Sequence, residues 1–192
     1  LSTTDGTNYG SGIVVGSTYT PTVPVKLYSS WIPVVYGVTY NANGGNGAPT
    51  VASQSYTFGS PNLALTTKGT LARTGYTFSG WNTLATGLGT NYLESASYKP
   101  TVSIILYANW TANDYTVSFN ANGGTGSITG LPIKAGTAKP LTANTAITRA
   151  GYTFAGWNTL ANGTGTPFAN SASVTFYADT ILFAQWTVVA PG

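Results

Sequence analysis

Tyr115-Thr-Val-Ser-Phe-Asn-Ala-Asn-Gly-Gly124 is a near copy of Tyr36-Gly-Val-Thr-Tyr-Asn-Ala-Asn-Gly-Gly45. Two other blocks recur in the same order: Gly75-Tyr-Thr-Phe-Ser-Gly-Trp-Asn-Thr-Leu84 with Gly151-Tyr-Thr-Phe-Ala-Gly-Trp-Asn-Thr-Leu160, and Leu106-Tyr-Ala-Asn-Trp110 with Leu182-Phe-Ala-Gln-Trp186. The copies are 76 to 79 residues apart. A fixed period indicates tandem repeats, each a small structural unit that packs with its neighbours.

The spacing of the blocks divides the chain into one partial and two complete repeats. We place the complete repeats at 33–111 and 112–187, with 188–192 as a tail or the start of another repeat. The last block alone occurs once more, as Leu27-Tyr-Ser-Ser-Trp31, so residues 1–32 match the C-terminal third of a repeat. A third of a repeat cannot bury its own apolar face. We therefore expect this segment to need a partner, either another subunit or the missing part of a longer array.

Within each repeat, apolar and polar residues alternate with the period of two that is typical of β-strands. Tyr115, Val117 and Phe119 share one face of such a strand, and the residues between them are polar. The Asn-Gly-Gly segments that follow supply residues tolerant of positive φ, as a turn requires. The pattern predicts a mainly β protein of tandem small repeats, with at most one short helix per repeat, at 60–71 or 136–147.

Aromatic residues are the main candidates for a functional surface. Strand parity places Trp31, Trp110 and Trp186 on the same face as inward leucines, and it places Trp81 and Trp157 on the face opposite their neighbouring Tyr and Phe residues. For five other residues, packing in the core and exposure at a ligand surface or at an interface between repeats both remain open: Trp81, Trp157, Tyr107, Phe183 and Tyr28. A further set, Val23, Val25, Leu27 and Trp31, is a candidate inter-subunit segment.

Composition argues for a folded chain and against most chemistry. The 192 residues are 42% hydrophobic and only 6% charged, the reverse of a disordered composition. His and Cys are absent, which removes the usual zinc, copper and haem ligands and the usual nucleophile–base pairs. The carboxylates, Asp5, Glu94, Asp114 and Asp179, do not occupy equivalent repeat positions. We therefore predict no enzymatic activity, no metal and no cofactor.

Charge and hydropathy also limit the partners. The net charge of +3 comes from scattered basic residues, so no phosphate-tracking patch and no nucleic-acid partner are predicted. The longest apolar runs are four or five residues, far shorter than a membrane-spanning helix. Two weaker motifs are a Glu94 and Lys99 pair, as required for a Lys–Asn isopeptide cross-link, and a glycan acceptor pattern, Asn162-Gly-Thr164.

The three blocks together resemble the Listeria–Bacteroides repeat, the B-repeat of internalin-type bacterial surface proteins. The resemblance lies in Val117–Gly124, Gly151–Thr159 and Leu182–Thr187, with the same blocks in the other complete repeat. It implies a β-grasp-like domain, strung in tandem along secreted or wall-attached proteins as a stalk or adhesion module. Two features depart from typical members: the charge is much lower, and the array begins within a repeat.

These observations lead to two functional hypotheses. The first is an extracellular structural protein of a bacterial surface, which acts as a stalk, spacer or filament subunit and whose partners are copies of itself or neighbouring repeats. The second is an adhesin module that binds glycan or a host surface through exposed aromatic residues and Asn/Thr loops.

Overall fold

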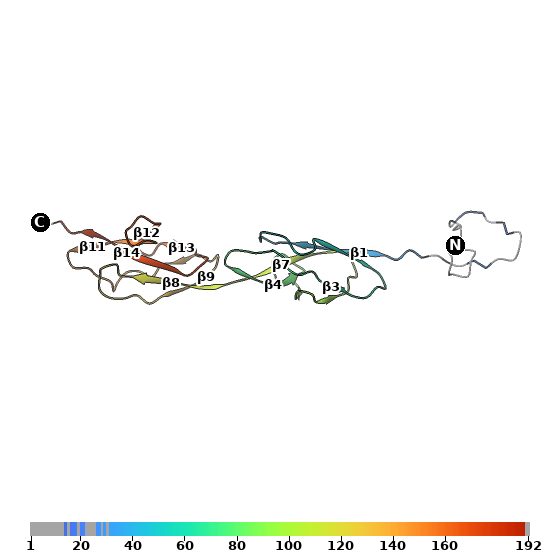
Figure 1. Ribbon diagram of the computed structural model, residues 1–192, viewed down its shortest axis with the longest axis horizontal. Coiled ribbons are helices and arrows are strands. Elements are labelled where there is room, and N and C mark those ends of the chain that lie inside the picture. The colour runs from blue at the N-terminus through green and yellow to red at the C-terminus, as the bar shows by residue number, and fades with distance from the viewer. Residues whose placement is uncertain are drawn as a thin grey trace.

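The computed structural model describes residues 31–190, together with residues 14, 16–18, 20, 21, 26, 27 and 29. Two β-rich repeats follow one another along the long axis of the molecule (Figure 1). The strands of the first repeat are β1 (Val35–Asn41), β2 (Ser53–Thr57), β3 (Leu63–Ala64), β4 (Tyr76–Asn82), β5 (Asn91–Tyr92), β6 (Ser97–Tyr98) and β7 (Ile104–Ala112). Those of the second are β8 (Asp114–Asn120), β9 (Leu131–Lys134), β10 (Lys139–Pro140), β11 (Tyr152–Asn158), β12 (Pro167–Phe168), β13 (Ser173–Val174) and β14 (Thr180–Val188).

Both repeats form the same five-stranded mixed sheet. The strand order is β2-β1-β7-β4-β5 in the first repeat and β9-β8-β14-β11-β12 in the second. The first and last long strands of each repeat pair in parallel, β1 with β7 and β8 with β14, and the other pairs in these sheets are antiparallel. A parallel pair needs a long crossover, and in each repeat the crossover carries the remaining strands.

The segments at 60–71 and 136–147 form no helix in the described chain. Each contributes a two-residue strand instead, β3 paired with β6 and β10 paired with β13. The backbone continues this pairing beyond the strands, because Leu65 and Leu141 donate hydrogen bonds to the carbonyls of Ala96 and Ala172. Pairing between segments distant in the sequence therefore replaces the local hydrogen bonds of a helix, and the protein is all-β over the described residues.

One face of each sheet forms the core, as the alternation predicts. Val38, Leu106 and Ala108 are fully buried in the first repeat, and Val117, Leu182 and Ala184 are fully buried in the second. Two separate clusters result, one for each repeat. Each repeat therefore has a hydrophobic core of its own.

Of the two alternatives left open for Trp81 and Trp157, core packing is the correct one, because both side chains are buried, with 0% and 1% of their surface exposed. The cause is a β-bulge. Phe78 pairs with Trp110 and Gly80 pairs with Asn109, so one extra residue lies between them and reverses the alternation of side chains. The same bulge occurs between Phe154 and Gly156. Each Trp therefore faces the core beside the preceding Phe, with ring centroids 5.2 Å apart in the first repeat and 5.1 Å apart in the second.

The core of the first repeat contains a polar network. The Trp81 indole N–H donates to the Thr66 carbonyl at 2.8 Å, and the Thr66 N–H donates to the Tyr40 hydroxyl at 3.3 Å. The Tyr40 hydroxyl in turn donates to the side-chain carbonyl of Gln54. In the second repeat the positions of Tyr40 and Gln54 are occupied by Phe119 and Leu131. The two cores thus share a shape but differ in polarity.

Candidate functional site: the junction between the repeats

The recurring blocks lock the loops of each repeat to its sheet. Asn43 has a positive φ of 48°, and its side-chain amide donates to the carbonyls of Ala85 and Ala108 at 2.8 and 2.9 Å. The Trp110 indole N–H donates to the Ala42 carbonyl at 3.0 Å. A Cβ on Gly45 would lie 2.6 Å from the Trp110 ring, so only glycine fits there. The first and third blocks are therefore in direct contact.

The Asn of the Trp-Asn-Thr motif organises the loop that follows it. Asn82 is fully buried, and its side-chain oxygen accepts hydrogen bonds from the Leu84 and Gly89 N–H groups, while its amide donates to the carbonyls of Gly87 and Gly89. Asn158 makes matching bonds in the second repeat to Leu160, Gly163 and Gly165. Buried polar groups need such partners, because an unpaired one costs about 1–3 kcal/mol. Sequence reasoning missed this role, although both Asn residues lie in the recurring block.

A single residue, Asn113, links the two sheets. β7 ends at Ala112 and β8 begins at Asp114. The Asn113 N–H donates to the Gly75 carbonyl at 2.9 Å in the first repeat, and its carbonyl accepts from Ala135 N–H at 3.0 Å in the second. The Thr77 hydroxyl also donates to the Asn113 side-chain oxygen at 2.7 Å. The linker is therefore hydrogen-bonded to both repeats and has little freedom of its own.

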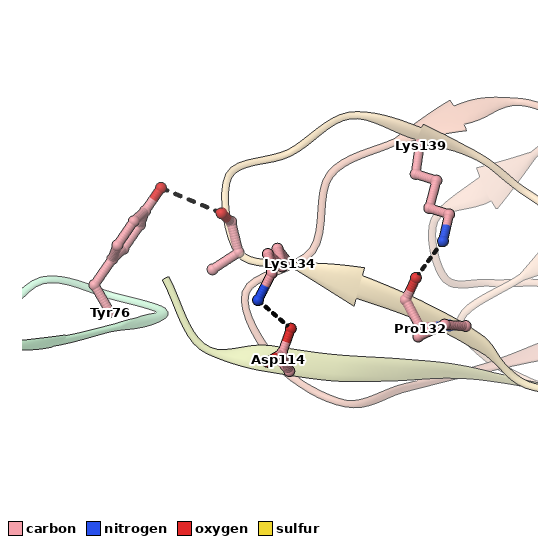
Figure 2. Close-up of polar contacts among 6 residues, drawn as sticks. Tyr76, Asp114, Pro132, Lys134 and Lys139 are labelled. Carbon is pink, nitrogen blue, oxygen red and sulfur yellow. Dashed lines mark hydrogen bonds and ion pairs between the residues drawn. The ribbon is translucent and has the colours of Figure 1, made fainter. Parts of the chain in front are cut away.

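Tyr76 bridges the junction from the first repeat to the second. Its hydroxyl donates to the Ala135 carbonyl at 3.2 Å, across the gap between the two ribbons in Figure 2. Arg73 lies over the Tyr76 ring, 4.1 Å from the centroid, in a cation–π contact. Ala135 is only 2% exposed. A Cβ on Gly75 would lie 2.8 Å from the Ala135 Cβ, and one on Gly136 would collide with the Tyr76 hydroxyl. The two repeats thus meet in close contact.

Two lysines, Lys134 and Lys139, lie on the second-repeat side of the junction. Lys134 forms an ion pair with Asp114 at 2.7 Å, and both side chains are largely exposed, at 61% and 76%. Lys139 donates to the Pro132 carbonyl at 2.6 Å (Figure 2). An exposed ion pair contributes little to stability, typically below about 1 kcal/mol. The Lys134–Asp114 pair therefore contributes little to the stability of the β8–β9 pairing.

The remaining predicted surface residues fall in two groups. Tyr107 and Phe183 are half-buried and lie opposite the buried leucines, as strand parity indicates. Leu27 is 42% exposed and Trp31 is 85% exposed, so Trp31 does not share the half-buried environment of Trp110. The rest of both sets, Tyr28, Val23 and Val25, lies outside the described residues.

The weaker chemical motifs find little support. Glu94 accepts a hydrogen bond from the Lys68 backbone N–H, and no described contact joins it to Lys99. In the glycan acceptor pattern, the Thr164 hydroxyl donates to the Asn162 side-chain oxygen at 2.8 Å, an ordinary turn contact. The described residues contain no cluster of three acidic, His or Cys residues able to hold a metal. None of their elements is a helix long and apolar enough to cross a membrane.

The junction also has a signal in the sequence, an Arg–Tyr pair that recurs in both repeats. Arg73-Thr-Gly-Tyr76 recurs as Arg149-Ala-Gly-Tyr152, and Arg149 stacks over Tyr152 at 4.0 Å just as Arg73 stacks over Tyr76. The Arg–Tyr pair is therefore a regular feature of the C-terminal end of a repeat. The role of this pair in joining repeats is visible only at Tyr76, which contacts the next repeat.

Comparison with known proteins agrees with this architecture. The model of the Listeria-Bacteroides repeat domain matches residues 36–109 and again 115–185. The chain belongs to the Listeria-Bacteroides repeat family. The two matches cover the two five-stranded sheets. The recurring blocks, the β-bulge and the loop after Asn82 or Asn158 therefore lie within the matched Listeria-Bacteroides repeat domains.

Several curated proteins are similar to this Listeria-Bacteroides repeat chain. A protein of Evansella cellulosilytica whose name describes a Gly-rich membrane protein is 32% identical over 71% of the chain. Internalin H of Listeria monocytogenes is 34% identical over 54% of the chain, and a second Evansella cellulosilytica protein, named as a membrane protein, is 27% identical over 83%. The chain spans only 14%, 19% and 23% of these relatives, respectively.

Proposed function

We propose that this chain is an extracellular spacer of a bacterial cell surface, in which tandem repeats hold other parts of a protein at a distance. Membership of the Listeria-Bacteroides repeat family supports this role, as do relatives named as internalin H and as membrane proteins. The proposed work is mechanical: each repeat buries its own core, and neighbours pack end to end.

The observation that carries the proposal is the Asn113 junction. Domains joined by a flexible linker move independently by default. Here the linker is one residue, with backbone hydrogen bonds to both repeats, and Tyr76 packs its hydroxyl against the second repeat. Such a joint favours a fixed angle between consecutive repeats, which is the property that a spacer needs.

The adhesin alternative has weaker support. Its main candidates for a sugar-stacking surface were Trp81 and Trp157, and both lie inside the cores. Tyr107 and Phe183 keep part of their rings exposed at equivalent positions on the outer sheet faces. No contact among the described residues arranges them as a platform with polar partners.

The rigid joint can be tested by spin labels, because the chain has no Cys of its own. Thr39 and Ser118 are exposed and equivalent positions in the two repeats. We expect the labelled variant T39C/S118C to give one narrow distance distribution by pulsed electron paramagnetic resonance. Tyr76→Ala removes the bridging ring and should broaden that distribution about twofold or more, since side-chain packing at the joint is lost.

Tyr152→Ala is the matched control, because Tyr152 holds the same place in the second repeat without a following repeat in the described chain. It should leave the distribution narrow. A broad distribution in T39C/S118C with Tyr76 intact would refute the rigid spacer, whatever the Tyr76→Ala and Tyr152→Ala variants do.

A further inference from the structure

Asparagine followed by glycine occurs four times in the sequence, and all four sites lie in the described part of the chain: Asn43-Gly44, Asn46-Gly47, Asn122-Gly123 and Asn162-Gly163. Asparagine is a thermolabile residue because its side-chain amide can be lost. Glycine in the next position favours this loss, since it has no Cβ to hinder attack by its peptide nitrogen on the asparagine side chain. In a folded protein, the reaction also requires that the side chain and this nitrogen are free to approach each other.

The Asn-Gly sites of the recurring Asn-Ala-Asn-Gly-Gly blocks are locked. The Asn43 amide donates to the carbonyls of Ala85 and Ala108 at 2.8 and 2.9 Å, and the Asn122 amide makes the two matching bonds in the second repeat, both at 2.8 Å. Both side chains are half-buried. Each amide must break two hydrogen bonds before it can turn toward the next peptide nitrogen, so these sites react only after local opening.

Asn162 is held in a different way. Its side-chain oxygen accepts hydrogen bonds from the Thr164 N–H at 3.1 Å and from the Thr164 hydroxyl at 2.8 Å. The attacking nitrogen is also engaged, because the Gly163 N–H donates to the Leu160 carbonyl at 3.1 Å. Asn162 and Gly163 are exposed, but both reacting groups have partners.

Asn46-Gly47 is the open site. Both residues are exposed, and among the described residues neither the Asn46 side chain nor the Gly47 N–H makes a hydrogen bond. Only the main chain of Asn46 is fixed: its N–H donates to the Ala72 carbonyl at 2.8 Å, and its carbonyl accepts from the Ala72 N–H at 2.9 Å. No bond of the side chain therefore has to break before the reaction.

The fold requires the glycine of this site but not the asparagine. Gly47 has a φ of 86°, and a Cβ there would lie 2.5 Å from the Thr70 carbonyl oxygen. The equivalent glycine of the second repeat, Gly126, is likewise crowded by a backbone oxygen, 2.0 Å from a Cβ. The residue before Gly126 is Thr125, which has no amide to lose. The open Asn-Gly site is therefore a property of the first repeat.

We propose that Asn46 is a site of spontaneous deamidation in the folded protein. The Gly47 peptide nitrogen loses its proton to base and attacks the side-chain carbonyl carbon of Asn46. A new C–N bond closes a five-membered succinimide, and the side-chain nitrogen leaves as ammonia. Water then adds to one of the two ring carbonyls and breaks its bond to nitrogen, which gives aspartate or isoaspartate. The sum consumes one water and releases one ammonia.

The product changes the first repeat alone. A carboxylate replaces a neutral amide, which lowers the net charge of +3 by one. Isoaspartate also adds a methylene to the main chain where Asn46 pairs with Ala72, and this disturbs both hydrogen bonds between them. Ala72 directly precedes Arg73, which stacks over Tyr76. The modification therefore acts on the segment that leads to the junction.

Peptide mapping by mass spectrometry tests the site in the whole 192-residue chain. Folded protein and protein unfolded in urea are kept side by side at mildly alkaline pH, and the acid form at each site is followed over time. In urea the four sites should react at similar rates. In the folded protein, Asn46 should react at least about tenfold faster than Asn43, Asn122 and Asn162, since those three must first open locally.

Two variants exchange the site between the repeats. Thr125→Asn places an asparagine before Gly126, and this new site should deamidate as fast as Asn46. Asn46→Thr takes its residue from the second repeat and should remove the acid form that appears first. Exchange of the Ala72 N–H, measured by NMR against that of Thr148 in the matching bridge, should accelerate as the modified form accumulates. It should stay constant in Asn46→Thr.

Several outcomes would overturn the inference. If Asn46 in the folded protein reacts as slowly as Asn43 and Asn122, the open site is not labile. If Asn43 or Asn122 reacts as fast as Asn46, hydrogen bonding of the side chain does not control the reaction. No reaction in Thr125→Asn would show that this loop position does not set the rate. None of these results affects the spin-label distances across Asn113, so the spacer proposal stands or falls separately.

Discussion

The first and second repeats form the same sheet around an equivalent buried Trp. The indole N–H of that Trp has a hydrogen-bond partner among the described residues only in the first repeat. Trp81 donates to the Thr66 carbonyl, whereas the Trp157 N–H is buried with no hydrogen-bond partner among the described residues. The rings around the two Trp residues are otherwise alike, with Tyr40 4.7 Å from Trp81 and Phe119 4.8 Å from Trp157. The shared blocks therefore do not decide this hydrogen bond.

The difference comes from a loop that varies between the copies. The segment from Gly45 to Gln54 is two residues longer than the one from Gly124 to Leu131, the position equivalent to Gln54. In the first repeat this longer loop covers the crossover, since Val51 N–H donates to the Thr66 hydroxyl and Thr50 N–H to the Thr67 carbonyl. Thr66 is 6% exposed, whereas Thr142 at the equivalent position is exposed.

The two repeats show that the residues of the recurring blocks form the sheet, whereas the variable segments determine which polar groups of the core are hydrogen-bonded. Block residues satisfy each other in both repeats, as the paired bonds of Asn82 and Asn158 show. The polar groups beneath the crossover are satisfied only where the loop is long enough to hold Thr66 in place. The second repeat compensates with apolar residues, Phe119 and Leu131.

The largest effect should be the one that the two repeats share. Asn82→Ala would leave the N–H groups of Leu84 and Gly89 and two loop carbonyls without a partner. We expect a loss of about 3 kcal/mol from the free energy of unfolding of the first repeat, and a similar loss for Asn158→Ala in the second. Urea unfolding followed by residue-resolved NMR would measure each repeat separately. Effects that differ by more than about twofold would show that the blocks are not equivalent.

A smaller change should separate the two repeats. Trp81→Phe removes a donor and leaves the Thr66 carbonyl unpaired, so we expect a loss of about 2–3 kcal/mol of stability, including the smaller ring. Trp157→Phe removes a buried N–H that has no partner among the described residues, which offsets the lost packing, and the loss should be below about 1 kcal/mol. The same urea experiment gives both values. Equal losses would mean that the Thr66 bond contributes nothing.

The smallest effect should appear at alkaline pH and only in the first repeat. Burial raises the pKa of Tyr40 above 10.0, opposed by the hydrogen bond from Thr66 and assisted by Tyr98, and burial also raises the pKa of Tyr98. A raised pKa means that the folded state holds its proton more tightly, so this stability is complete below pH 10 and is lost as the pH rises above it. Phe119 and Val174 occupy the equivalent positions.

Hydrogen exchange or NMR signal loss between pH 9 and 12 would follow both repeats in one sample. The first repeat should unfold at lower pH than the second, and Tyr40→Phe should reduce the gap. Unfolding of both repeats at the same pH, unchanged by Tyr40→Phe, would assign the alkaline transition to other tyrosines.

Much of the architecture can be predicted from local patterns in the sequence. The alternation at Tyr115, Val117 and Phe119 correctly identifies the strand and its core face, because side chains in a strand point to opposite sides in turn. The recurring blocks correctly indicate the family and the mainly β tandem repeats. These features depend only on residues close in the sequence, so one chain without a structure is enough to read them.

Parity failed at Trp81 and Trp157, because a single bulged residue reverses every later side chain in the strand. The glycine after the bulge, Gly80, has a φ of 129° and lies against the Tyr92 backbone. A glycine within a strand block indicates a bulge only when the partner strand is known. The two segments that the sequence left open to a short helix form strands for a related reason, since β3 and β10 obtain their hydrogen bonds from strands more than 30 residues away.

The sequence by itself determined that this protein is a tandem β-repeat with three fixed blocks, because repetition and alternation are properties of the linear chain. Only the tertiary structure decided that both Trp side chains are buried and that Asn113 and Tyr76 hold two repeats together. It also decided that Val34, Val35, Phe58, Val188 and Val189 are each more than half exposed among the described residues. Burial and contact between repeats depend on packing between residues that are distant in the sequence, so local sequence patterns do not determine them.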